Sequence, residues 1–249
     1  MTDQTVIVFD REGDPQSGLQ PWDPIAAETL VSGSPTQRGH TYFSTSSDRL
    51  TAGVWDAPAH VEQRDAYSVD EFMFLLEGSL GIENEDGSRQ TFHAGEACFI
   101  PKGAVLQWQQ SEYLRKFWVI HDNPDSAPAA AGLTAMLVDP GVALTPVSGL
   151  EQAPFESDIP QMGLQTLYQD PEGKFVVGVW DCSPMKRVPS TIERSELMHI
   201  LEGSGSITNA DGVVFEFKAG DTFLVPVGMG YQWQNHEYVK KLFCSYTSL

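Results

Sequence analysis

Short apolar runs that end at turn residues recur along the chain, and this pattern predicts strands. Residues 72–76 and 197–201 are largely apolar, and each run is followed by Gly-Ser one residue further on. An Asp-Gly pair comes next in both places, at 86–87 and 211–212, and is typical of a hairpin turn because glycine adopts positive φ without strain. Such closely spaced strands indicate a β-sandwich or barrel. Only residues 25–31 offer one or two helical turns.

The chain repeats itself at an offset of 125 residues. The tetrapeptide GVWD at 53–56 recurs at 178–181. Between 53–118 and 178–243, 25 of the 66 positions are identical without a gap. This period is too long for a solenoid repeat, so the pattern indicates a duplicated domain. We therefore predict two β-barrels of like topology that superpose at this offset.

The repeat sets the expected domain boundaries. The first domain is expected over residues 1–121, as an N-terminal arm followed by a barrel core at 41–121. Residues 122–132, which include NPDSAPAAA, have the composition of a linker. The second domain is expected over 133–249, with its core at 164–249. Both arms contain apolar residues, so each is expected to pack on a barrel instead of remaining exposed.

Charge and composition limit the possible partners. The 249 residues include 34 acidic and 15 basic side chains, for a formal charge of −19. A chain this acidic lacks the basic surface that nucleic acids and anionic membranes require. No apolar run approaches the roughly 20 residues that span a bilayer, and the first residues do not read as a signal peptide. The expected location is cytoplasmic. The three cysteines are far apart and indicate no disulfide framework.

Each half carries a pair of glycine-containing motifs. The pattern E-x6-G occurs at 71–78 and 196–203, and G-x5-P-x-G occurs at 95–103 and 220–228. These resemble the two motifs of the cupin superfamily. The Gly-Val-Trp opening, the Leu-Glu-Gly strand end and the closing Glu-Tyr-x-x-Lys are similar to the ureidoglycine aminohydrolase-like cupin family, cupin_3. The resemblance implies an all-β fold with two tandem jelly-roll barrels of six to eight strands, which is a bicupin.

The resemblance also implies where a metal would bind. Metal-binding cupins place His-x-His three or four residues before the motif glutamate, and a third histidine three residues after the last glycine. Here the third positions hold Leu106 and Tyr231, and only Glu71 and Glu196 remain. The other positions hold Arg64 and Ala66 or Asp65 and Tyr67 in the first half, and Pro189 and Thr191 or Ser190 and Ile192 in the second. One carboxylate does not hold a transition metal tightly, so no metal or other cofactor is predicted. Some relatives are nevertheless metalloenzymes with rearranged ligands.

Strand alternation indicates which side chains face the barrel interiors. Counting by twos from the motif residues points Met198, Ile200 and Trp233 inward, with Met73, Leu75, Leu106 and Trp108 as their counterparts. These side chains either fill a small barrel or line an apolar pocket with a few polar groups. Trp55 and Trp180 are expected to serve packing. The candidate ligand-binding residues are Arg64, Tyr67, Glu71, Trp108, Lys116, Glu196, Tyr231, Trp233 and Lys241.

The histidines are weak candidates for chemistry. His60 lies eleven residues before Glu71, and from a loop it could approach the barrel mouth. His199 follows Glu196 by three, so the two should point to opposite faces of a strand. His93 and His236 are expected to be solvated.

A buried carboxylate without a metal must be paired, hydrogen-bonded or neutralised. Lys116 and Lys241 are the only lysines matched at the 125-residue offset. We therefore predict interior pairs Glu71–Lys116 and Glu196–Lys241. The alternative is a pair of surface contacts with Glu112 and Glu237, four residues before each lysine.

Three functions remain open at this point, the last of which is purely structural: one barrel supports the other, or the chain is a scaffold for assembly. The first is a bicupin that binds a small polar metabolite, as a monomer or homodimer. The second is a catabolic enzyme, such as an aminohydrolase, lyase or isomerase, with or without a metal. In that case Glu71 or Glu196 would be the base, with Tyr231 or Lys241 as a partner.

Overall fold

The computed structural model describes residues 5–45, 49–122, 124 and 132–247. The chain divides into two compact units. One is Phe9–Val138, and the other is Asp139–Leu249 together with Met1–Val8, as far as these residues are described. Within the described part of the chain, no helix is long and apolar enough to cross a membrane.

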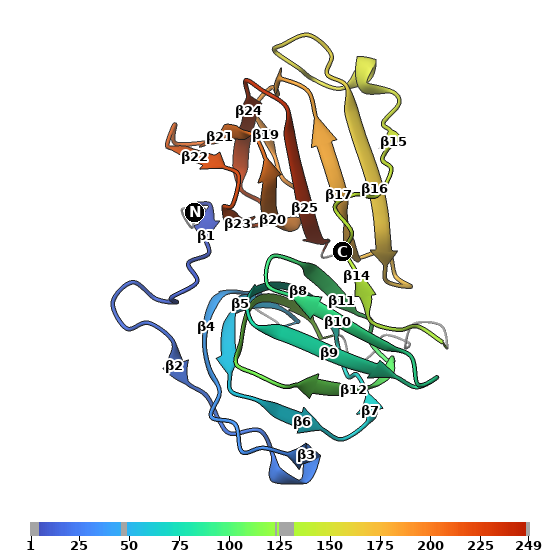
Figure 1. Cartoon of the computed structure of the whole chain (residues 1–249). Helices are drawn as coiled ribbons and strands as arrows, with labels where there is room; N and C mark the ends of the chain where they lie inside the picture. The colour runs from blue at the N-terminus through green and yellow to red at the C-terminus, as the bar shows by residue number, and fades with distance from the viewer. Residues whose placement is uncertain (1–4, 46–48, 123, 125–131, 248–249) are drawn as a thin grey trace. The chain divides into compact units, whose positions relative to one another are not determined.

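The first unit consists of two antiparallel sheets (Figure 1). The seven-stranded sheet has the order β14-β11-β8-β13-β5-β4-β2, and the second has the order β10-β9-β12-β6-β3, with β7 also paired to β12. The strands are β2 (Gln20–Pro21), β3 (Leu30–Ser32), β4 (Arg38–Ser44), β5 (Leu50–Ala57), β6 (His60–Glu62), β7 (Asp65–Ala66), β8 (Asp70–Glu77), β9 (Ser79–Asn84), β10 (Arg89–His93), β11 (Ala97–Ile100), β12 (Val105–Gln110), β13 (Leu114–His121) and β14 (Met136–Leu137). The expected helical turns reduce to a 3-10 helix, η1 (Ala27–Thr29).

The second unit repeats this arrangement. Its seven-stranded sheet has the order β1-β23-β20-β25-β17-β16-β15, and its second sheet has the order β18-β24-β21-β22, with β19 also paired to β24. The strands are β1 (Ile7–Val8), β15 (Thr145–Pro146), β16 (Met162–Gln169), β17 (Phe175–Cys182), β18 (Met185–Lys186), β19 (Ser190–Thr191), β20 (Ser195–Glu202), β21 (Ser204–Asn209), β22 (Val214–Lys218), β23 (Thr222–Val225), β24 (Gly230–Asn235) and β25 (Val239–Tyr246), with the 3-10 helix η2 (Leu150–Gln152). Each unit thus has the two antiparallel sheets of a jelly roll, as predicted.

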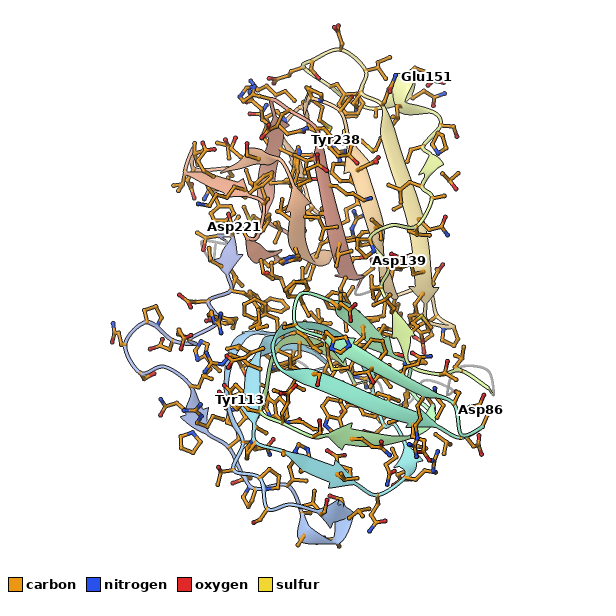
Figure 2. The ribbon with its side chains drawn as sticks, in the orientation of Figure 1. Asp86, Tyr113, Asp139, Glu151, Asp221 and Tyr238 are labelled. Carbon is orange, nitrogen blue, oxygen red and sulfur yellow. The ribbon has the colours of Figure 1, made fainter. Side chains whose placement is uncertain are left out.

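The 125-residue offset extends from the sequence to individual contacts. Strands β8 and β20 begin and end at this offset, as do β13 and β25. Figure 2 labels Tyr113 and Tyr238, whose hydroxyls donate to Asp56 Oδ2 at 2.7 Å and to Asp181 Oδ2 at 2.8 Å. These residues are themselves 125 apart, so the predicted duplication is confirmed.

The glycine that ends each E-x6-G motif is required by the backbone. Gly78 and Gly203 have φ of +80° and +83°. A Cβ added at either position would lie 2.0 Å from a carbonyl oxygen, that of Tyr113 or Tyr238. Only glycine fits both the backbone conformation and this close approach.

Each arm pairs with a barrel, but the beginning of each arm pairs with the other barrel from the one that the expected domain boundaries assign to it. Strand β1 pairs with β23 of the second unit, and β14 pairs with β11 of the first. Residues 5–8 therefore pack with the barrel that follows later in the chain, and residues 133–138 pack with the barrel that precedes them. Most of the expected linker at 122–132 lies outside the described residues.

Strand alternation separates the barrel interior from the opposite face. Met73, Leu75 and Trp108 belong to one buried cluster, and Met198 and Trp233 to the other, as predicted. His199 is also buried, but its Nδ1 lies 2.8 Å from Thr222 Oγ1 on the neighbouring strand β23. Burial lowers the pKa of His199 to about 4, although the charge of Asp221 opposes this shift. Asp221, labelled in Figure 2, immediately precedes β23.

This shift makes stability depend on pH. Because the folded-state pKa of His199 is below its ordinary value of 6.5, the unfolded chain binds a proton first as pH falls. We expect the contribution of His199 to be complete above pH 6.5 and to be lost as pH falls toward 4, by up to about 3 kcal/mol. Denaturant unfolding between pH 5 and 7 measures this slope. His199→Gln should flatten it and His93→Gln, at an exposed site, should not. An equal slope in all three proteins would contradict the assignment.

Candidate functional site

Each barrel encloses a buried pair formed by a glutamate and a lysine. Lys116 Nζ donates to Glu71 Oε1 at 2.8 Å, and Lys241 Nζ donates to Glu196 Oε1 at 2.7 Å. All four side chains are less than 10% exposed. The predicted interior pairs are confirmed.

Strand alternation turns each lysine inward, because Lys116 pairs with Leu75 and Lys241 pairs with Ile200, and both partners belong to the buried clusters. Strands β13 and β8 shift register between Arg115 and Lys116, and β20 and β25 shift between Ile200 and Glu202, the residues that face Lys241 and Lys240. In both places the extra residue lies on β8 or β20 and not on the strand that carries the lysine. The alternative surface pairs do not form in the described residues, where Glu112 accepts from Ser79 Oγ at 2.7 Å and Glu237 from Ser204 Oγ at 2.6 Å.

Two tryptophan rings and a methionine surround each ammonium group. Lys116 Nζ lies 5.0 Å from the Trp55 ring centroid and 4.7 Å from that of Trp108. The equivalent distances from Lys241 are 4.8 Å to Trp180 and 5.1 Å to Trp233. Met73 and Met198 place Sδ 3.1 Å from the respective Nζ atoms. Ring faces are negative and attract a cation.

Trp55 and Trp180 serve packing as expected, since Trp55 belongs to the first buried cluster and Trp180 packs against the second, but packing is not their whole role. Both rings contact a buried ammonium, and both border cavities. Their occurrence in the repeated GVWD segment identified them as shared positions. It did not reveal this role, because the lysine that they face comes about 60 residues later in the chain.

The second oxygen of each glutamate has a different partner in each barrel. The Tyr67 hydroxyl donates to Glu71 Oε2, whereas Arg194 Nε donates to Glu196 Oε2 at 2.6 Å. Burial raises the pKa of Tyr67 and the charge of Glu71 raises it further, so this hydroxyl keeps its proton. Burial alone would raise the pKa of Glu196, but the charges of Lys241 and Arg194 outweigh it and lower the pKa to about 2.

A cavity adjoins each pair. The first has a volume of about 280 Å³ and the second about 380 Å³. The first is lined by Trp22, Ile25, Gln37, Trp55, Glu62, Tyr67, Glu71, Trp108, Lys116, Trp118 and Ile120. The second is lined by Val147, Met162, Leu164, Thr166, Val176, Trp180, Met185, Arg187, Ile192, Arg194, Glu196, Met198, Tyr231, Trp233, Lys241, Phe243, Ser245 and Thr247. Eight of the nine candidate ligand-binding residues thus border a cavity.

The ninth candidate, Arg64, lies elsewhere. Its guanidinium pairs with Glu83 at 2.5 Å and donates to the Asn84 carbonyl oxygen at 2.6 Å. His60 does not line the cavity either; it is buried on β6, with Nδ1 2.9 Å from the Pro58 carbonyl oxygen. Sequence reasoning missed Arg187 and Arg194, although both replace non-basic residues at the repeat offset.

The donor set does not fit a resident transition metal. Both oxygens of Glu71 and of Glu196 accept hydrogen bonds from donors, and a cationic ammonium lies against each carboxylate. The residues that the structure describes contain no group of three or more His, Cys, Asp or Glu placed to hold a metal ion. An ammonium at hydrogen-bond distance repels a divalent cation, so the lysine supplies the positive charge at each carboxylate.

A family model matches both barrels. The Cupin_3 model, described as the EutQ-like cupin domain, matches residues 45–118 and 169–243. The chain belongs to the Cupin_3 family. The resemblance inferred from the two motifs is confirmed. The comparison with curated proteins gives no match.

Solved structures share the whole bicupin fold. A protein of unknown function from Pseudomonas syringae pv. tomato is 22% identical, with a TM-score of 0.78, over 98% of this chain and 100% of its own. A cupin 2 conserved barrel domain protein from Leptotrichia buccalis has a TM-score of 0.57 at 12% identity, over 92% and 98%. A putative glyoxylate induced protein from Pseudomonas aeruginosa has a TM-score of 0.56 at 12% identity, over 96% of each chain. These likenesses establish the fold of this cupin.

The two ion pairs should differ in their contribution to stability. Lys116→Met leaves the buried Glu71 with the Tyr67 hydroxyl, and we expect a loss of about 3–5 kcal/mol in the free energy of unfolding. Lys241→Met should cost less, because Arg194 still pairs with Glu196. Lys240→Met is the matched control, since its side chain points to the opposite strand face. Denaturant unfolding measures all three. Equal, small losses would contradict the buried pairing.

Proposed function

We propose that this cupin binds a small polar metabolite and that its main binding site is the cavity of the second barrel. The observation that supports this most strongly is the 380 Å³ cavity next to the Glu196–Lys241 pair. Small-molecule sites are concave and largely apolar, with a few polar groups that fix orientation. Trp180 and Trp233 supply flat apolar surface, and Tyr231 and Arg194 supply polar groups.

The first barrel is a weaker candidate for the main site. Its cavity is smaller, and the N-terminal arm contributes Trp22 and Ile25 to the lining. The Trp22 ring packs edge-on against Trp118, with centroids 6.1 Å apart. The arm therefore fills space that remains open in the second barrel, where the equivalent of Trp22 is the smaller Val147.

The enzyme alternative finds less support. Among its candidate catalytic residues Glu71, Glu196 and Tyr231, Glu196 has its pKa lowered to about 2 by Lys241 and Arg194. A carboxylate with so low a pKa is a weak general base at neutral pH, because the best base has a pKa near the working pH. The Glu196–Lys241 ion pair instead provides fixed polar groups on the surface of the cavity.

Native mass spectrometry of the full chain, after exposure to cell extract, tests this proposal. We expect a small organic molecule on the wild-type protein and less than stoichiometric transition metal by elemental analysis. Met162→Trp, which fills the second cavity, should lose the bound molecule because Met162 lines it. Val213→Trp, at an exposed position, should retain the molecule. No bound molecule on the wild type, or one metal ion per chain, would contradict the proposal.

A further inference from the structure

The same residues form the centre of each cavity. At the 125-residue offset, five lining or contacting positions carry the same residue in both barrels. These pairs are Trp55/Trp180, Glu71/Glu196, Met73/Met198, Trp108/Trp233 and Lys116/Lys241. In each centre, one ammonium faces one carboxylate, so their charges cancel. Any preference of a cavity for charged ligands must come from the remaining lining residues.

The charge at one rim position is reversed between the barrels. Glu62 lines the first cavity, and Arg187, 125 residues later, lines the second. The backbone confirms that they are equivalent. The Gln107 side chain donates to the Glu62 carbonyl oxygen at 3.0 Å, and Gln232, again 125 residues later, donates to the Arg187 carbonyl oxygen at 2.8 Å. A carboxylate in one barrel thus occupies the position of a guanidinium in the other.

A second basic residue is added only in the second barrel. Arg194 corresponds to Val69, and Tyr231 corresponds to Leu106. Arg194 uses Nε for its bond to Glu196, and its side chain is 53% exposed. The four N–H donors on its terminal nitrogens are not part of that bond. Arg187 Nη1 lies 3.4 Å from the Tyr231 hydroxyl, which places a polar group beside this guanidinium.

The second cavity therefore holds two guanidinium groups beyond its neutral centre, whereas the first holds an extra carboxylate. Guanidinium groups bind carboxylates through two parallel hydrogen bonds. The side chains of Met162, Met185 and Ile192 form an apolar wall of the same cavity. This combination suits an organic anion that has a carboxylate head and an apolar body.

We propose that the second barrel selects small organic carboxylates and that the first barrel rejects them. This selectivity rests on the proposed function, because it names the ligand class of the same cavity. Arg187 and Arg194 set the preference, and Glu62 and Val69 account for its absence in the first barrel. The shared lysines do not set it, because each is neutralised by its glutamate.

Methionine-methyl NMR on the full chain tests the selectivity with site resolution. Met162, Met185 and Met198 report on the second cavity, and Met73 on the first barrel. The probes are benzoate, benzamide and benzamidinium, which have similar shapes and charges of −1, 0 and +1. Benzoate should shift the second-cavity methyls and bind there at least about tenfold more tightly than benzamide, equivalent to about 1.4 kcal/mol.

Exchange of the rim residues provides the matched variants. The double variant Arg187→Glu with Arg194→Val gives the second barrel the residues of the first at these two positions, and it should lose the benzoate preference. Arg187→Lys with Arg194→Lys keeps the charge and should retain most of it. Glu62→Arg with Val69→Arg should make Met73 respond to benzoate. Ligand-free methyl spectra show whether each variant is folded.

Two outcomes would overturn the selectivity. Equal affinity of benzoate and benzamide at the second-cavity methyls would do so while leaving small-molecule binding intact. A benzoate response at those methyls that survives in folded Arg187→Glu, Arg194→Val protein would also do so. If none of the three probes shifts these methyls up to its solubility limit, the selectivity fails, and metabolite binding is decided by mass spectrometry alone.

Discussion

The buried ion pair between a glutamate and a lysine is the interaction on which both barrel centres depend. A carboxylate in an apolar interior is costly unless it is paired and hydrogen-bonded. Lys116 and Lys241 provide that pairing at 2.8 and 2.7 Å, and two tryptophan faces and a thioether surround each ammonium. The lysine thereby supplies the positive charge that a bound metal supplies in metal-binding cupins. The pair occurs in both halves with the same neighbours, so it belongs to the duplicated unit.

Much of the fold was accessible from the sequence because its evidence is local or repeated. The gapless repeat predicted two like barrels, and strand alternation placed Met73 and Trp108 inside. The orientation of Lys116 depended on the exact register of β13 and β8, in which Lys116 pairs with the interior residue Leu75, and the residue pattern does not determine that register. Strand β14 pairs with β11 and β1 with β23. These pairings depend on contacts between segments far apart in the chain, so the arm composition predicted packing but not the partner.

The sequence predicted the residues at the centre of the second cavity but not the two arginines that also line it. Glu196, Lys241 and Trp233 could be found because the repeat retains them. Arg187 and Arg194 were missed because a search for shared residues passes over positions where the halves differ. A search of the same alignment for positions where the charge changes sign would have found Arg187, which is aligned with Glu62. In this duplicated chain, the shared positions form the barrel centres, and we propose that the differing positions separate the ligands of the two halves.

A double-mutant cycle on Glu71 and Lys116 tests the central claim most directly. The free energy of unfolding is measured for wild type, Glu71→Met, Lys116→Met and the protein carrying both changes. If the two charges neutralise each other inside the barrel, each single change leaves one buried charge unpaired, and the double variant recovers much of the loss. The expected coupling energy is about 2–3 kcal/mol. Additive losses, with a coupling energy below about 0.5 kcal/mol, would contradict the account.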